Sequence, residues 1–369
     1  MKEKFLKLHK DSLFRNSFYL MLATAVMAGF GFFFWLISAR LFTIENIGLA
    51  TTLISVMNLI STLSLIGFNS TFVRFLPKSD RPNDDLNTGM ILVGIAALVL
   101  SSMFVIFVKT LSPNLSFIGE SFTISVLFII FCVMTGLNIL TDSVFLAKRQ
   151  TKYTLIINTI FSAVKMLLPF AFIGLGAIGI FSAAAAGQAV GFILSVAVMI
   201  WKFDYRPKLI IELDVLKRVW KYSTGNYIAG VFSLLPMTML PLIITNRLSP
   251  GDAGYFYIVM MIANLLYVIP RSTTSSLFAE SSNDEHSLDA NVKKSIKIIS
   301  ILLIPSILIL FFGAWPILRI FGKGYAAEGV NFLRLVAITG ISISINNIIG
   351  SLFQFKKNLR SIILFNMIY

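Results

Sequence analysis

A lysine lies near the middle of an apolar stretch that is long enough to cross a bilayer. In the stretch 153–173, Lys165 is roughly 18 Å from the first residue, within a hydrocarbon core about 30 Å thick. From that depth its side chain reaches neither interface comfortably. Asn158, Ser162, Lys165 and Pro169 share one helical face. Because a lipid-facing cation there costs about 2.5–3.5 kcal/mol, we predict that this face lines a polar cavity. A structural lysine paired inside a helix bundle is the alternative.

Other apolar segments carry polar stripes at helical spacing. The amides in them are Asn58 and Asn69 in 47–72, Asn138 in 122–146, Asn264 in 254–277 and Asn346 in 330–354. Hydrogen bonding between helices is one role for such amides. Because polar faces occur in both halves of the chain, we also predict a central cleft that these residues line.

Two arginines are further candidates for binding an anion. Arg271 lies roughly 25 Å along a helix that starts near Gly254, close to the predicted inner boundary. It either faces the cleft or extends to the interface. Arg74 follows the second span and is a candidate gate or lipid contact. Cations and amides together suit an anionic head group, since arginine binds phosphate in a bidentate manner.

Catalysis and metal binding find little support in the sequence. Both histidines, His9 and His286, lie outside the apolar segments, so none is available inside the membrane for acid–base chemistry or metal ligation. Asp84 and Asp85 precede an apolar segment, where carboxylates favour a helix N-terminus. We therefore predict no catalytic residue, no metal, no cofactor and no enzymatic activity.

The composition is that of a polytopic membrane protein, because 57% of the 369 residues are hydrophobic and only 13% are charged. The predicted spans are 17–38, 47–72, 88–108, 122–146, 153–174, 178–201, 222–245, 254–277, 296–318 and 330–354. An eleventh begins near Ser361 and is cut off at Tyr369. We therefore expect a fragment whose second half lacks roughly 35–45 residues.

The positive charges predict the orientation of the chain. With the N-terminus inside, inner segments hold 23 of the 31 Lys and Arg residues, and outer segments hold 6. The sequence thus predicts a multi-pass protein of the cell membrane with a cytoplasmic N-terminus. The net charge of +14 follows from this topology and from lipid contact, so nucleic acid is not an expected partner. The basic, amphipathic segment 1–16 suits an anionic membrane surface.

An internal repeat relates the two halves of the chain. Arg40, Leu41, Glu45 and Gly48 recur as Arg247, Leu248, Asp252 and Gly254, and Asn138 and Asn158 recur as Asn346 and Asn366. The offset is 206 to 208 residues. An even number of spans per repeat keeps both halves in the same orientation. The prediction is an all-α polytopic fold with two parallel six-helix lobes around a central cleft. The N-terminal lobe is 1–201, the basic cytoplasmic connector 202–221, and the C-terminal lobe 222–369, with four complete helices and the start of a fifth.

Several short motifs, taken in order, resemble the polysaccharide flippases (Wzx-like proteins) of the multidrug/oligosaccharidyl-lipid/polysaccharide exporter superfamily. They are Ser12-Leu13-Phe14-Arg15-Asn16, Arg40-Leu41 with Gly48, Gly67-Phe68-Asn69, Arg74-Phe75-Leu76-Pro77, Phe321-Gly322-Lys323-Gly324-Tyr325 and Phe332-Leu333-Arg334-Leu335. The resemblance implies two six-helix lobes flanking a cationic cleft. It also implies alternating-access transport of undecaprenyl- or dolichyl-diphosphate-linked oligosaccharides across the cytoplasmic membrane.

The same resemblance implies that Lys165 and Arg271 contact the diphosphate or acidic sugars. Expected partners are a polyprenyl-diphosphate-linked oligosaccharide, membrane lipids, and a glycan polymerase or glycosyltransferases. Multidrug exporters of the superfamily often carry an acid in span one, and 17–38 has none. An ion-coupled multidrug or metabolite exporter remains the alternative. A membrane glycosyltransferase or polymerase is the alternative from another class. A major-facilitator protein is disfavoured because 74–86 lacks its glycines.

Overall fold

The computed structural model describes residues 12–283 and 288–355, and these form helices and turns without any strand. Packing divides the chain into two compact units, Met1–Gly254 and Tyr255–Tyr369. Most of the predicted amphipathic segment 1–16, His286 and the start of the eleventh span at Ser361 lie outside the described residues.

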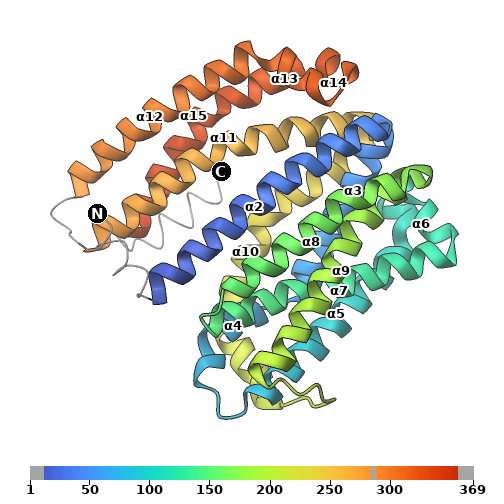
Figure 1. The fold of residues 1–369 in the computed structure, drawn as a ribbon, viewed down its shortest axis with the longest axis vertical. Coiled ribbons are helices and arrows are strands. Elements are labelled where there is room, and N and C mark those ends of the chain that lie inside the picture. The colour runs from blue at the N-terminus through green and yellow to red at the C-terminus, as the bar shows by residue number, and fades with distance from the viewer. Residues whose placement is uncertain (1–11, 284–287, 356–369) are drawn as a thin grey trace. The chain divides into compact units, whose positions relative to one another are not determined.

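The first unit is a bundle of long helices (Figure 1). Its helices are α2 (Ser12–Leu41), α3 (Ile44–Ser64), α4 (Phe68–Phe75), α5 (Pro82–Leu111), α6 (Phe117–Glu120), α7 (Phe122–Ala147), α8 (Lys152–Ala171), α9 (Gly176–Phe203) and α10 (Leu213–Arg247). Helix α2 packs on α8, α8 packs on α9, and α3 packs on α7, α9 and α10. Because α10 packs along α3, it is grouped with the first unit, whereas the repeat places its sequence in the second half.

The remaining helices are α11 (Pro250–Asn283), α12 (Leu288–Phe312), α13 (Ala314–Phe321), α14 (Lys323–Glu328) and α15 (Val330–Phe355). Among the described residues of both units, nine helices are long and apolar enough to cross a membrane, and α10, which contains the predicted span 222–245, is not one of them. In a helix the backbone N–H and C=O groups form hydrogen bonds with each other, and this is necessary in a bilayer because hydrocarbon offers them no partner. The prediction of an all-helical, multi-pass membrane protein is confirmed.

Local sequence signals explain where several helices begin. The side chain of Thr43 accepts a hydrogen bond from the backbone N–H of Asn46, so it caps α3. Helix α5 begins at Pro82 and has Asp84 and Asp85 in its first turn. The interpretation of these two carboxylates as a helix N-terminus is therefore confirmed.

Two predicted spans differ from the helices observed. The span 47–72 is interrupted after α3, where Ile66 and Gly67 have φ angles of 47° and 85° before α4 begins. The left-handed conformation suits glycine, but a β-branched residue adopts it at a cost, and the pattern of apolar residues does not report it. The span 296–318 ends early as well, because α12 stops at Phe312 and the separate helix α13 follows Gly313.

Two glycines at equivalent positions of the repeat meet in one close contact. A Cβ atom added to Gly48 would lie 1.6 Å from the carbonyl oxygen of Pro250, and one added to Gly254 would lie 2.6 Å from that of Ile44. Ile44 and Pro250 are themselves 206 residues apart, as Gly48 and Gly254 are. The contact is therefore reciprocal, which is the pattern that a twofold axis between parallel repeats produces.

Candidate functional site

Lys165 on α8 lies inside the first unit, against an aromatic ring. Its Nζ atom is 4.5 Å from the ring centroid of Phe34 on α2, and Phe34 is fully buried. The lysine side chain is half-buried. Within the part of the chain that the structure describes, no carboxylate oxygen lies within 4.0 Å of this ammonium group. A cation–π contact contributes about 0.5–2 kcal/mol, which offsets only part of the cost of placing a cation in the membrane.

Glycines on α9 allow α8 to approach closely and bring its polar face inside the bundle. A Cβ atom at Gly187 would lie 2.9 Å from the Cβ atom of Lys165 and 3.1 Å from the carbonyl oxygen of Phe161. A Cβ atom at Gly191 would lie 3.2 Å from both amide atoms of Asn138 on α7. The three helices α7, α8 and α9 therefore converge around Asn138 and Lys165.

Two of the predicted amides, one on α7 and one on α8, have partners here. Asn138 is buried, and its Nδ2 donates to Oε1 of Gln188 at 2.7 Å. Asn158 is also buried, and its Nδ2 lies 3.2 Å from the sulfur of Met27 on α2. Both amides thus connect helices, as the alternative role for them predicted. Sequence reasoning missed Gln188, although a glutamine within an apolar span was a visible signal.

A carboxylate completes the polar interior of the first unit. Asp142 follows Asn138 by one turn of α7 and is half-buried. It lies beside Thr154 of α8, whose buried hydroxyl has no hydrogen-bond partner among the described residues. We call Asn138, Asp142, Asn158, Lys165 and Gln188 the α8 site. Ionisable groups in a membrane span mark functional sites more often than structural ones.

The other predicted residues do not belong to this cluster. Asn58 and Asn69 in the first unit, and Asn264 and Asn346 in the second, are half-buried. Arg74, on α4, is exposed, and its guanidinium lies 5.5 Å from the ring of its neighbour Phe75. In the second unit, Arg271 is an exposed residue of α11.

Comparisons with solved structures give the same fold over nearly the whole chain. A structure of the lipid II flippase MurJ in an inward closed conformation is 16% identical, with a TM-score of 0.73, and the match covers 93% of this chain and 77% of that one. The MATE multidrug transporter DinF-BH is 15% identical, with a TM-score of 0.60 and coverage of 96% and 85%. An outward-facing MATE family transporter of the MOP superfamily is 15% identical, with a TM-score of 0.58 and coverage of 97% and 86%.

The helices and these likenesses define a multi-pass membrane protein with the two-lobe fold of the transporters of the multidrug/oligosaccharidyl-lipid/polysaccharide exporter superfamily. No curated protein matches the sequence. The family described as "Polysaccharide biosynthesis protein" matches residues 37–327, which is well over half of the chain. The protein belongs to that family.

Proposed function

We propose that this protein flips lipid-diphosphate-linked oligosaccharides across the cytoplasmic membrane by alternating access, for the assembly of a polysaccharide or glycoconjugate. The family membership supports a role in polysaccharide biosynthesis. The likeness to a structure named as a lipid II flippase supports a fold able to carry a lipid-linked substrate. In this proposal the N-terminus is cytoplasmic, and the lobes 1–201 and 222–369 move relative to each other about the connector.

The observation that carries the proposal is the environment of Lys165. Its ammonium lies in the middle of a membrane-spanning helix, against Phe34 and with no acidic partner among the described residues. A diphosphate is an anion that would compensate this charge, because a hydrogen bond from an ammonium group to a phosphate oxygen is stronger than one between neutral groups. Arg271 is proposed as a second cation for the same head group. Substrate binding drives the transition only if it stabilises the occluded state over the open ones.

Asp142 favours a second candidate function, an ion-coupled exporter of drugs or metabolites. An intramembrane carboxylate beside a hydroxyl that has no hydrogen-bond partner among the described residues is able to bind a proton or a cation. The likeness to multidrug transporters agrees with this alternative. An Asp142→Asn variant separates the two functions. In the exporter it abolishes ion-coupled efflux, whereas in the flippase any change falls on translocation of the lipid-linked substrate, because Asp142 belongs to the α8 site.

The proposed function is tested by translocation of a labelled lipid-diphosphate-oligosaccharide in proteoliposomes containing the full-length protein. We expect Lys165→Ala to abolish most translocation and Lys165→Arg to restore part of it, since arginine retains the charge. Lys152→Ala is the matched control, because Lys152 lies on the same helix over the ring of Tyr153 but is exposed. Its translocation should equal that of the wild type.

Equal translocation by all four proteins would contradict a role for the Lys165 charge. No translocation by the wild type, with any lipid-diphosphate-oligosaccharide supplied, would contradict the flippase itself. A membrane glycosyltransferase or polymerase would instead extend the labelled glycan, which chromatography of the recovered lipid detects.

A further inference from the structure

The chain between α9 and α10 is held against one end of α5. Residues 204–212, which we call the strap, are the part of the predicted connector 202–221 that lies outside helices. Asn83 and Asn87, one turn apart on α5, bond to the strap backbone on both sides. The bonds are Asn83 Nδ2 to the Asp204 carbonyl (3.2 Å), Arg206 N to Asn83 Oδ1 (3.1 Å), Asn87 Nδ2 to the Arg206 carbonyl (3.0 Å) and Lys208 N to Asn87 Oδ1 (3.0 Å). These four hydrogen bonds fix the backbone of the strap to α5, so the strap is an ordered part of the first unit.

Three further contacts hold the two ends of the strap against α5 and the residue before it. The buried hydroxyl of Tyr205 donates to Asn87 Oδ1 at 2.8 Å, and burial raises the pKa of this phenol. At the other end, the N–H of Glu212 donates to Thr88 Oγ1 at 2.9 Å, and the Glu212 carboxylate lies 3.8 Å from Arg81.

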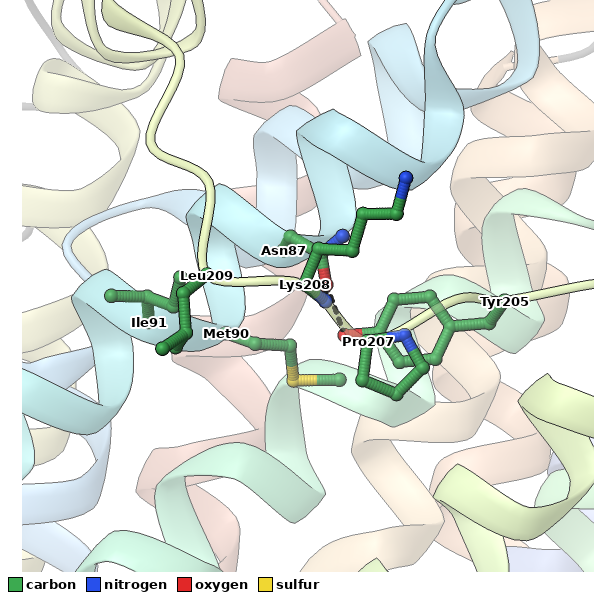
Figure 2. Close-up of a pocket in the computed structure, with 7 residues that line it drawn as sticks. All are labelled: Asn87, Met90, Ile91, Tyr205, Pro207, Lys208 and Leu209. Carbon is green, nitrogen blue, oxygen red and sulfur yellow. Dashed lines mark hydrogen bonds between the residues drawn. The ribbon is translucent and has the colours of Figure 1, made fainter.

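A pocket of about 270 Å³ lies between the strap and α5 (Figure 2). Its lining residues are Asn87, Met90, Ile91, Tyr205, Pro207, Lys208 and Leu209. Apart from Asn87 and the strap's polar atoms, the walls are apolar. Figure 2 shows the Lys208 ammonium extending away from Met90 and Pro207, so the charge is not inside the pocket. A volume below the roughly 300–1,000 Å³ of complete ligand sites suits one part of a larger amphiphile.

The apolar surface continues from the pocket along α5. Ile91, Ile95 and Leu98 follow at steps of four and three and so share one face of the helix. Ile95 and Leu98 are about half exposed in the protein alone, on a helix that crosses the membrane. On the strap, Leu209 is 95% exposed, which is unfavourable in water but suits the edge of the hydrocarbon region. The pocket thus shares Ile91 with an apolar face of α5 that acyl chains would contact in a membrane.

The charges beside the pocket favour an anionic head group. Arg206 and Lys208 are both exposed on the strap, whose own acids are Asp204 and Glu212, and Asp84 in the first turn of α5 is half-buried. The Glu212 charge is compensated by Arg81. The charge distribution of the sequence places this end of the bundle at the cytoplasmic side, where anionic lipids are enriched.

We propose that the strap pocket binds one anionic phospholipid of the cytoplasmic leaflet. One acyl chain occupies the pocket beside Met90 and Leu209 and continues along Ile91, Ile95 and Leu98. The phosphate contacts Lys208 and Arg206. The proposal does not depend on the transported substrate, and it assigns to the strap a lipid-binding role separate from the α8 site.

The test is a titration of the detergent-purified full-length protein with phosphatidylglycerol and, separately, phosphatidylcholine, read by native mass spectrometry. We expect the first bound phosphatidylglycerol to be held more tightly than phosphatidylcholine. Lys208→Gln removes one basic residue near the head group and should weaken phosphatidylglycerol about fivefold, leaving phosphatidylcholine unchanged. Met90→Trp fills the pocket and should weaken both lipids. Lys217→Gln is the matched control, because Lys217 is exposed just beyond the strap and pairs with Asp214 at 3.2 Å.

Equal binding of the two lipids by the wild type would overturn the proposal, as would unchanged binding by Met90→Trp. An equal loss for Lys208→Gln and Lys217→Gln would reduce the effect to general surface charge and would also overturn it. If a lipid-diphosphate-oligosaccharide displaces phosphatidylglycerol from the wild type but not from Met90→Trp, the pocket belongs to the substrate path and the separate lipid site is wrong. Translocation by Lys165 variants is measured independently, so the two proposals fail in different experiments.

Discussion

The close contact at Gly48 predicts that a single methyl group disrupts the first unit. In Gly48→Ala the new Cβ atom would start 1.6 Å from the carbonyl oxygen of Pro250, whereas ordinary contact begins at 3.4 Å. The backbones must therefore separate by about 1.8 Å, the difference between these distances. Backbone atoms on both sides leave no flexible side chain to move instead. The reciprocal Gly254→Ala needs a separation of about 0.8 Å, from 2.6 Å to 3.4 Å, and so should disturb the structure less.

The energetic cost follows from the contacts that this separation breaks. One turn along α3, the Thr52 and Thr245 hydroxyls lie 2.6 Å apart, and Thr52 donates within its own helix to the Gly48 carbonyl at 2.8 Å. Overpacking costs about 1–3 kcal/mol, and the loss of the one hydrogen bond between Thr52 and Thr245 adds about 1 kcal/mol. A total of about 2–4 kcal/mol corresponds to a fall in melting temperature of roughly 4–8 °C, at about 2 °C per kcal/mol.

The single cysteine provides the assay. Cys132 is fully buried on α7, so a thiol-reactive fluorophore labels it only as the protein unfolds. The control is Gly31→Ala on α2, where an added Cβ meets no atom within 4 Å. It should melt at or slightly above the wild-type temperature, because alanine favours a helix over glycine. If Gly48→Ala melts no lower than Gly31→Ala, the argument from the glycine contact is wrong.

Three further predictions concern hydrogen bonds at the predicted cytoplasmic end. Asn87→Ala removes one buried and two part-buried bonds at about 1 kcal/mol each and should lower the unfolding free energy by about 3 kcal/mol. Asn83→Ala, whose bonds are exposed, should cost less than about 1 kcal/mol. Asn16→Ala removes the bonds from the Thr151 N–H and hydroxyl to the Asn16 side chain, at 3.1 and 2.9 Å, and should cost about 1–3 kcal/mol. Because burial raises the pKa of Tyr205, the stability it contributes is complete below the ordinary tyrosine pKa of about 10 and is lost at higher pH.

Each of these predictions has a contradicting result in the same melting assay. An equal fall in melting temperature for Asn87→Ala and Asn83→Ala would show that burial does not determine how much stability each asparagine contributes. An unchanged melting temperature for Asn16→Ala would show that α2 is held to the start of α8 by apolar packing alone. For the Tyr205 phenol, the melting temperature of Tyr205→Phe should fall less steeply with pH than that of the wild type above pH 10. Parallel plots of melting temperature against pH would contradict the predicted linkage.

Composition and hydropathy alone are sufficient to predict the class of the protein and to single out its most unusual residue. Helical spans are readable from composition, because hydrocarbon forces each segment to satisfy its own backbone. Lys165 is conspicuous for the same reason, since a cation in such a segment needs an explanation that does not depend on the fold. The sequence also shows that Gly48 and Gly254 are equivalent positions of the internal repeat, but it does not show that they lie in contact.

The contacts of these residues, in contrast, follow from how the helices pack against one another. Gln188 is 50 residues from Asn138, Phe34 is 131 residues from Lys165, and the strap is about 120 residues from Asn87. Hydropathy and helical period report which face of a helix is polar, but not which helix lies opposite that face. Glycines allow two backbones to approach closely, and this helps to select which helices pack together. Helix α9 packs on α8 in this way, through Gly187. A cluster such as the α8 site, or a pocket under the strap, exists only once segments distant in sequence have packed together.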